Sequence, residues 1–428
     1  AGAGASSGMA MAHWEIQGWM ILILGWVFVP FYSRSMVYTM PEFLERRYNP
    51  QSRTILSVIS LVSYVLTKVA VTVYAGGLVF QQVFGIKELW GIDFFWIAAI
   101  GLVVLTALYT IFGGMKSVLY TSVLQTPILL LGSLIILVLG FKELGGWDEM
   151  MRVCGAVTVN DYGDTMTNLI RSNDDANFPW LGALIGSAII GFWYWCTDQF
   201  IVQRVLSGKN EKEARRGTIF GAYLKLLPVF LFLIPGMIAF ALHQKYIGAG
   251  GEGFLPMLAN GTANADAAFP TLVAKLLPAG VKGLVVCGIL AALMSSLASL
   301  FNSSAMLFTI DFYKRFRPET PEKKLVGIGQ IATVVIVILG ILWIPIMRSV
   351  GDVLYTYLQD VQSVLAPGIA AAFLLGICWK RTSAQGGMWG LIAGMIIGLT
   401  RLGAKVYYSN AGEVADSTFK YLFYDMNW

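Results

Sequence analysis

Apolar stretches of roughly 20 residues recur along this 428-residue chain, and they constrain its fold more than any other feature. Each is long enough to cross the ~30 Å hydrocarbon layer of a membrane as one helix. With 57% hydrophobic residues, 13% charged residues and a mean hydropathy of +0.67, the chain is too apolar for a soluble globule of this size. We therefore expect an all-α integral membrane protein with one transmembrane domain over residues 1–428.

The pattern predicts about ten transmembrane helices joined by short connections. Their predicted ranges are 9–33, 54–83, 93–113, 117–141, 179–204, 217–242, 281–313, 324–347, 352–379 and 384–408.

Basic residues concentrate in the connections that follow the odd-numbered predicted helices. They include Arg34, Arg46, Arg47, Arg53, Lys116, Arg204, Lys209, Lys212, Arg215, Arg216, Lys314, Arg315, Arg317, Lys323, Lys324, Lys380 and Arg381. By the positive-inside rule these connections face the cytoplasm, so 142–178 and 243–280 are expected to be extracellular or periplasmic loops. Both chain ends then lie outside. This predicts a further membrane helix before Ala1, with the stretch 1–8 as its loose outer end.

A short amphipathic segment, 269–278, lies within the second of these outer loops. It can form a half-helix over an outer vestibule or a surface helix at the membrane interface. The sequence leaves both interpretations open.

Several function classes find no support in the sequence. The four cysteines form no Cys-x-x-Cys pair, and Cys196, Cys287 and Cys378 are expected to be small buried hydrophobic residues. The glycine pairs at 113–114 and 386–387 are interpreted as turns, and no nucleotide-binding motif is present. The net charge of +5 comes from the connecting loops. We therefore expect no enzyme and no nucleic-acid partner.

A first cluster of polar residues occurs where membrane helices normally avoid them. The stretch GFWYWCTDQ (191–199) places three aromatic residues beside a hydroxyl, a carboxylate and an amide. Glu15, Lys225 and Gln359 stand in three other predicted helices. Hydroxyl groups of a sugar need such donors and acceptors, and its C–H face packs on rings such as those of Tyr194 and Trp195.

Each of these residues also has a structural interpretation when it is taken alone. Glu15 can reach the outer interface, and Lys225 can extend to the membrane surface or pair with a carboxylate. An aromatic run is usually packing. Their joint occurrence favours a solute site.

A second cluster, in the seventh predicted helix, is rich in oxygen atoms. Ala292, Ser295 and Ser296 can offer a backbone carbonyl and two hydroxyls to a hard cation such as sodium, with the remaining oxygens supplied by another helix. Serines in membrane helices more often bond to their own backbone, and that interpretation stays open.

These motifs together resemble the sodium/glucose cotransporters of the solute:sodium symporter family. The resemblance rests on WYWCTDQ (193–199), IVQR (201–204), YLKL (223–226), LMSSL (293–297), the Asn302-Ser303 pair, and FLL to WKR (373–381). It implies an inverted-repeat bundle of the leucine-transporter type, whose first core helix would precede Ala1.

The resemblance also implies roles for single residues. Glu15, Lys225 and Gln359 match sugar-hydroxyl ligands, with Trp195 beside them. Tyr194 matches an inner gate that stacks on the sugar, and Trp14 and Tyr355 match an outer aromatic gate. Ala292, Ser295 and Ser296 match the sodium ligands.

The chain departs from the family pattern at several positions. The outer pair reads Trp14 then Glu15, whereas the family has Glu then Trp, so the register of Glu15 is open by one residue. Gly191 replaces a polar residue. Ser122 stands where two-sodium members carry an acid, and Ala298 where they carry Thr, which predicts one sodium per sugar.

The sequence thus predicts sodium-coupled uptake of a neutral hexose by alternating access, with sodium as coupling ion and no other cofactor. A plasma membrane or bacterial inner membrane location follows from the need for a sodium gradient, with membrane lipid as surroundings. The alternatives are a sugar-gated sensor or channel, and a sodium symporter for another solute such as inositol or sialic acid.

Overall fold

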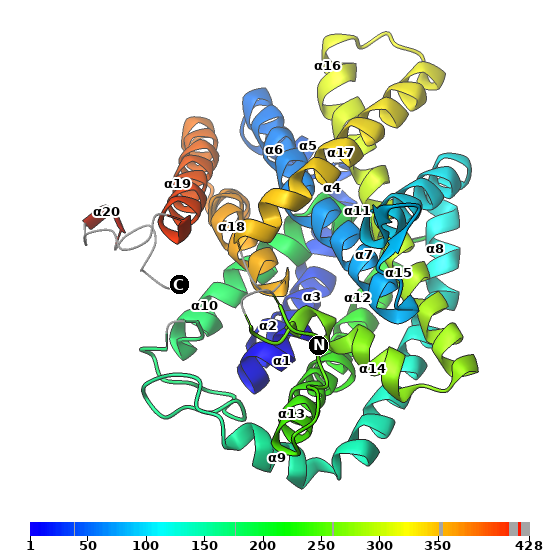
Figure 1. Ribbon diagram of the computed structural model, residues 1–428. Coiled ribbons are helices and arrows are strands. Elements are labelled where there is room, and N and C mark those ends of the chain that lie inside the picture. The colour runs from blue at the N-terminus through cyan, green and yellow to red at the C-terminus, as the bar shows by residue number, and fades with distance from the viewer. Residues whose placement is uncertain (38, 176, 259–260, 351–353, 411–417, 421–428) are drawn as a thin grey trace.

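The computed structural model describes residues 1–37, 39–175, 177–258, 261–350, 354–410 and 418–420, which form a bundle of helices (Figure 1). In this part of the chain the only strands are β1 (Glu88–Leu89) and β2 (Ile92–Asp93). They pair antiparallel across Trp90 and Gly91, which both have positive φ, as a two-residue hairpin turn requires. The predicted all-α fold class is confirmed.

The first half of the chain builds four long helical stretches and a peripheral helix. These elements are α1 (Gly2–Ser7), η1 (Gly8–Met11), α2 (Ala12–Ile16), η2 (Gln17–Trp19), α3 (Met20–Ile23), η3 (Leu24–Phe28), α4 (Val29–Ser35), α5 (Met40–Arg47), α6 (Pro50–Ser63), η4 (Tyr64–Val69), α7 (Ala70–Phe84), α8 (Phe94–Leu144), α9 (Trp147–Gly155), α10 (Trp180–Gly191), η5 (Phe192–Thr197) and α11 (Gln199–Leu206).

The second half continues the bundle with five more stretches. Its elements are α12 (Glu211–Leu224), η6 (Val229–Leu233), α13 (Ile234–Gly248), η7 (Ala265–Ala267), α14 (Ala268–Leu276), α15 (Ala279–Met306), η8 (Leu307–Tyr313), α16 (Lys314–Phe316), α17 (Glu322–Val350), α18 (Leu354–Cys378), α19 (Ala384–Asn410) and α20 (Thr418–Lys420).

Nine helical segments of the described chain are long and apolar enough to cross a membrane. The predicted helices 93–113 and 117–141 are the exception to a one-to-one match, because both lie in the single helix α8. The predicted turn at Gly113 and Gly114 is therefore wrong, and so is the one at Gly386 and Gly387, which lie within α19. Glycine weakens a helix by about 1 kcal/mol relative to alanine but supplies no obligatory turn, so neighbouring helical residues can carry the backbone through it.

Five of the long stretches contain a π-helical segment, namely η3, η4, η5, η6 and η8. Such bulges occur often at functional sites. After η5 the helix breaks at Asp198, whose backbone is extended with φ −78° and ψ 126°. Its side chain accepts from the backbone N–H of Phe200 at 3.0 Å and so begins α11.

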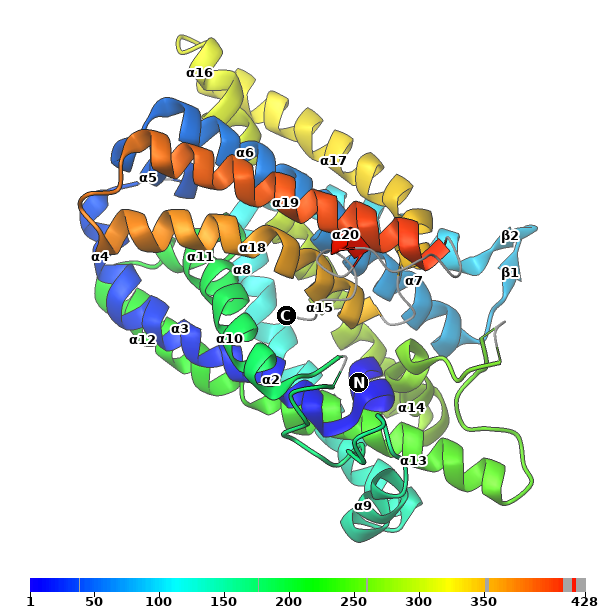
Figure 2. The ribbon, with the colours of Figure 1, turned by 90° about the vertical axis from the view of Figure 1, so that its left-hand side faces the viewer.

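Three of the predicted cytoplasmic connections meet at one end of the bundle, whereas the one predicted at Lys116 lies within α8. Figure 2 shows α4, α5 and α16 at this end, with α9 and the β1–β2 hairpin toward the other. Arg47 donates to the carbonyl of Gly376 at 2.6 Å and to that of Trp379 at 2.9 Å. Arg315 donates to the Pro50 carbonyl at 2.8 Å. The basic residues thus join three connections, and that this end faces the cytoplasm stays a prediction.

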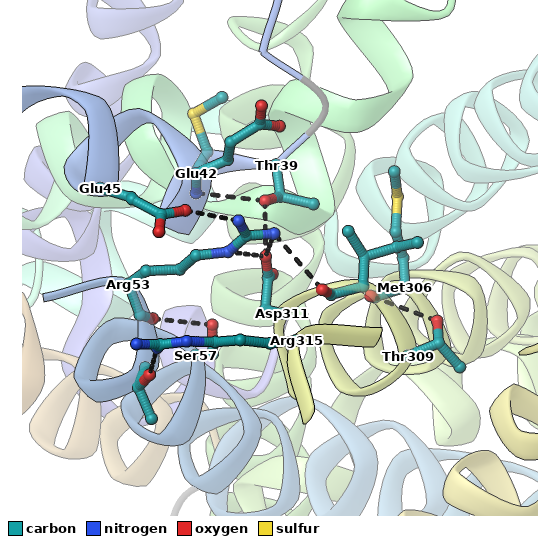
Figure 3. Close-up of polar contacts among 12 residues, drawn as sticks. Thr39, Glu42, Glu45, Arg53, Ser57, Met306, Thr309, Asp311 and Arg315 are labelled. Carbon is teal, nitrogen blue, oxygen red and sulfur yellow. Dashed lines mark hydrogen bonds and ion pairs between the residues drawn. The ribbon is translucent and has the colours of Figure 1, made fainter. Parts of the chain in front are cut away.

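A buried carboxylate organises part of the same end (Figure 3). Asp311 of η8 is fully buried and accepts from Thr39 at 3.0 Å and from Nε of Arg53 at 2.7 Å. Arg53 also donates to Glu45 at 2.5 Å. The hydroxyl of Thr39 caps α5 by accepting from the Glu42 N–H at 3.2 Å. One side chain from the end of the α15 stretch therefore fixes the corner between α5 and α6.

The prediction that the stretch 1–8 is loose is wrong. Residues 2–7 form the helix α1, which packs against α13. A Cβ atom on Gly4 would clash with the Leu233 carbonyl, and one on Gly236 would clash with the Ala1 carbonyl. Small residues permit this close backbone approach in membrane helices. Packing against α13, which local sequence does not reveal, therefore orders the segment.

The cysteine prediction is also corrected in part. Cys154 and Cys196 are buried, whereas Cys287 and Cys378 are exposed on the outer faces of the bundle. Outer faces of a membrane bundle meet lipid, which accepts a small apolar side chain as readily as a protein core does.

Candidate functional site

The aromatic residues of η5 are arranged edge to face. The rings of Tyr194 and Trp195 lie 4.9 Å apart at 81°, and those of Trp193 and Tyr194 lie 6.3 Å apart at 72°. Trp193 is buried, while Tyr194 and Trp195 are only partly buried. The π-helical path of η5 thus presents two consecutive rings, Tyr194 and Trp195, at the edge of the packed interior.

Glu15 of α2 and Lys225, which ends α12, form an ion pair. The Lys225 ammonium also lies 5.9 Å from the centroid of the Trp195 ring. Gly18 makes this approach possible, because a Cβ there would lie 2.7 Å from Cγ of Lys225. The side chains of Lys225 and Glu15 keep 22% and 16% of their surface exposed, so the pair remains within reach of a solute. Of the two structural interpretations left open for Lys225, pairing with a carboxylate is the observed one.

Glu15 also lines a cavity of about 330 Å³, a size typical of small-molecule sites. Its walls come from α1, α7, η6, α14 and α18, and they are mostly apolar. The lining residues are Ala1, Gly2, Ala3, Gly4, Met11, Glu15, Val71, Ala75, Leu78, Val79, Pro228, Phe232, Leu233, Asp266, Phe269, Pro270 and Leu358. Phe269 and Pro270 of the segment 269–278 belong to this wall. Both interpretations of the segment, a half-helix over an outer vestibule and a surface helix at the membrane interface, stay predictions.

The remaining predicted solute and gate residues occupy different positions. Trp14 is partly buried between two packed clusters. Gln359 of α18 is buried and neighbours Leu358 at the cavity wall. The side chain of Tyr355 lies outside the described residues. The structure thus brings together Tyr194, Trp195, Lys225 and Glu15 in one continuous chain of contacts.

The predicted sodium ligands lie on α15. The hydroxyls of Ser295 and Ser122 are 2.5 Å apart, which brings α8 to the site. Ser299 donates to the Ser295 carbonyl at 3.0 Å. Ser295 is buried, Ala292 is partly buried and Ser296 is exposed. Ser122 was noted in the sequence only as a departure, and the structure makes it an oxygen neighbour of Ser295.

Arg204 of α11 approaches the same oxygen-rich surface. Its guanidinium donates to the hydroxyl of Ser299 and approaches the Ser295 carbonyl at 3.4 Å. The described part of the chain contains no group of three His, Cys, Asp or Glu side chains able to hold a metal. A cation at this place would depend on neutral oxygens, which suit sodium better than a transition metal.

Sequence reasoning missed a further ion pair, which is buried, between Lys68 of η4 and Asp198. Asp198 belongs to the WYWCTDQ motif but received no role, and Lys68 was not singled out. A charged residue inside an apolar helix is a signal by itself, and Lys68 stands in the middle of the apolar stretch 50–84. Its partner, 130 residues away, could not be read from that signal.

The fold and these contacts define a class of protein: a multi-pass helical membrane protein with a solute-sized cavity beside broken helices. The chain belongs to the sodium:solute symporter family, whose model matches residues 1–394. This is a family of transporters. It confirms the predicted family resemblance, and with the nine apolar segments it confirms a multi-pass membrane location.

Curated relatives are similar over most of this chain. Human sodium/myo-inositol cotransporter 2 is 37% identical over 415 residues, which cover 94% of this chain and 60% of the human protein. Mouse sodium/glucose cotransporter 4 is 37% identical over 422 residues, which cover 96% and 61%. The chain therefore spans about 60% of the length of these relatives.

A solved structure supports the fold independently. The substrate-bound outward-open state of a sodium-coupled sialic acid symporter superposes with a TM-score of 0.75, covering 95% of this chain and 81% of that one. At 22% identity this likeness concerns the fold alone, and it confirms the predicted transporter-type bundle.

Proposed function

We propose that this chain is a secondary active transporter that couples sodium entry to uptake of a neutral polyhydroxylated solute, with a hexose as the first candidate. The observation that carries this proposal is the Glu15–Lys225 pair: Glu15 lines the cavity, and the Lys225 ammonium lies beside the Trp195 ring. The pair offers donors and acceptors to hydroxyl groups without a net charge, and the ring offers an apolar face.

Charge balance favours a neutral solute over an acidic one. A solute carboxylate near this pair would be repelled by Glu15, while Lys225 is already neutralised. Inositol is the second candidate, because it presents the same kind of hydroxyl ring and a 37% identical relative is named for it.

Sodium would bind near Ala292, Ser295 and Ser296 and favour the conformation that accepts solute. A change to the inward-open conformation would release both the sodium ion and the solute. A membrane potential of ~100 mV adds about 2.3 kcal/mol for each sodium that enters. Ser122 and Ala298 favour one sodium per solute, and a plasma or bacterial inner membrane supplies the gradient.

Reconstitution of the full chain into proteoliposomes tests this proposal. Labelled glucose, myo-inositol and sialic acid are offered separately under an inward sodium gradient, and accumulation above equilibrium is measured. We expect accumulation of glucose, competition by inositol and none by sialic acid. A sodium ionophore should abolish accumulation. A sensor or channel would equilibrate or exclude the solute without accumulating it, and that result would overturn the proposal.

One charge per solute is the expected stoichiometry. The stoichiometry can be measured as the membrane potential at which net solute flux is zero under known sodium and solute gradients. A potential that corresponds to two sodium ions per solute would reject the inference from Ser122 and Ala298.

A further inference from the structure

The ammonium of Lys68 is enclosed by three aromatic rings and one carboxylate. It lies 4.8 Å from the ring centroids of Tyr64 and Tyr194 and 4.4 Å from that of Phe200. Its ion-pair partner is Asp198. The two side chains expose 9% and 2% of their surface, so the charges are almost completely removed from solvent. Paired charges in a bundle interior are costly to place there and are usually functional.

Both carboxylate oxygens of Asp198 have a partner on η4, and Oδ1 also accepts from the start of α11. Oδ2 pairs with Lys68, while Oδ1 accepts from the Tyr64 hydroxyl at 2.7 Å and from the Phe200 N–H at 3.0 Å. The Tyr64 oxygen in turn accepts from the Phe200 N–H at 3.1 Å. These contacts bind η4 to the point where η5 ends and α11 begins. The extended backbone of Asp198 is thereby held in place from the neighbouring helix.

The ring of Tyr194 connects this buried pair to the solute site. One of its contacts is the Lys68 ammonium at 4.8 Å, and another is the Trp195 ring at 4.9 Å. Trp195 lies next to Lys225, which pairs with Glu15. Two ion pairs therefore flank the Tyr194–Trp195 aromatic pair, one buried and one within reach of a solute. A cation near an aromatic ring stabilises one position of that ring.

We propose that Lys68 and Asp198 are positioning residues that hold the Tyr194 ring at the inner side of the solute site. This inference rests on the proposed function and on the role of inner gate that the family resemblance implies for Tyr194. Lys68 contacts the ring directly, and Asp198 acts through Lys68 and through the start of α11. Neither residue contacts the solute. When η4 and η5 separate during inward opening, the Tyr194 ring loses its contact with the Lys68 ammonium and becomes free to turn.

A double-mutant cycle between Lys68 and Tyr194, measured with the full chain in proteoliposomes, tests this assignment. Lys68→Met should raise the KM for the transported solute about tenfold, which corresponds to about 1.4 kcal/mol, and should increase sodium-independent solute leak. Tyr194→Ala should do the same. The double variant should be no worse than Tyr194→Ala, because the ring that Lys68 positions is already absent. Lys68→Arg keeps the charge and should restore a KM near that of the wild type.

Further variants separate positioning from a merely structural role. Asp198→Asn keeps the side-chain volume and should reproduce the Lys68→Met effect, and the exchanged pair Lys68→Asp with Asp198→Lys should recover part of the function. Tyr194→Phe keeps the ring and should leave the Lys68→Met effect intact. Glu213→Gln, which removes a pair with exposures of 64% and 52%, serves as the matched control and should change nothing.

Additive KM effects of Lys68→Met and Tyr194→Ala would overturn the assignment. So would an Asp198→Asn variant with reduced thermal stability but an unchanged KM and no added leak. If the wild-type chain transports none of the three solutes, the proposed function fails instead. Wild-type transport together with unchanged KM values in the Lys68 and Asp198 variants rejects only the positioning role.

Discussion

Glu15 and Lys225 stand 210 residues apart in the sequence, yet their side chains form an ion pair, of which Glu15 lines the cavity. The pair joins α2 to the end of α12, and it places both charges beside the Trp195 ring. A solute that binds there exchanges hydrogen bonds with a pair that is already formed. Such a site needs little rearrangement of charge before the solute arrives.

Removing the Glu15 carboxylate should weaken solute binding strongly. Glu15→Ala takes away an acceptor and leaves Lys225 without its partner, so we expect the solute Kd to rise at least about tenfold, equivalent to ~1.4 kcal/mol. Sodium binding should persist. Separate binding titrations with labelled sodium and labelled solute check both parts, with Glu213→Gln as control, and an unchanged solute affinity would reject the role given to Glu15.

Removing hydroxyls from the predicted sodium site should weaken sodium dependence. Ser295→Ala and Ser296→Ala each delete an oxygen ligand, so the sodium concentration for half-maximal uptake should rise about tenfold, in the range of one hydrogen bond to a charged group. Ser303→Ala is the matched control, because its buried hydroxyl bonds to the Ser299 carbonyl of its own helix at 2.9 Å. If the sodium dependence of uptake is unaltered in Ser295→Ala and Ser296→Ala, sodium binds at another place.

The buried carboxylate of Asp311 should be important for stability. Asp311→Asn leaves Arg53, whose side chain is 15% exposed, without one of its two carboxylate partners. Breaking a buried pair in this way costs about 3–5 kcal/mol. Thermal unfolding in detergent should show a clear loss of stability. Glu42→Gln provides the comparison: it removes the pair with Arg46, which is 50% exposed, and should cost no more than about 1 kcal/mol. Equal losses for the two variants would contradict the prediction.

The predicted outer loop 142–178 should lose order only in acid. A hydrogen bond from Asn160 at 2.9 Å and one from the Ser172 N–H at 2.8 Å lower the pKa of Asp164 below its usual value of 3.8. A lowered folded-state pKa stabilises the loop above the usual value, and the contribution is lost as the pH falls from there through the folded pKa. The protection factors of the loop amides, which are exchange rates corrected for the intrinsic effect of pH, should therefore be constant from about pH 5 to 7 and fall below about pH 4. Asp164→Asn should remove this acid dependence.

Much of the architecture could be predicted because it depends on local composition. Apolar stretches of membrane-spanning length identify helices wherever they occur, and nine such segments are present in the described chain. The family resemblance rested on contiguous motifs such as WYWCTDQ, and the match over residues 1–394 confirms it. The failures were also local. A Gly-Gly pair did not end α8, and small residues at 1–8 formed a helix because α13 packs against them.

The site was predictable only as a set of residue types. Glu15, Tyr194, Trp195 and Lys225 were selected because polar and aromatic groups in membrane helices are costly, and the structure joins these four in one chain of contacts. Their roles in binding remain predictions, as do those of Ala292, Ser295, Ser296 and Gln359. The neighbours Ser122 and Arg204 could not be assigned to the oxygen-rich surface from spacing along the chain.

The sequence by itself determined that this chain spans a membrane with helices, which family it belongs to, and which side chains are too polar for lipid. Those properties follow from hydropathy and motifs over a few consecutive residues. Only the tertiary structure decided that Lys68 pairs with Asp198 and Glu15 with Lys225. An ion pair needs two side chains within a few ångströms, and helix packing brings these together from positions 130 and 210 residues apart.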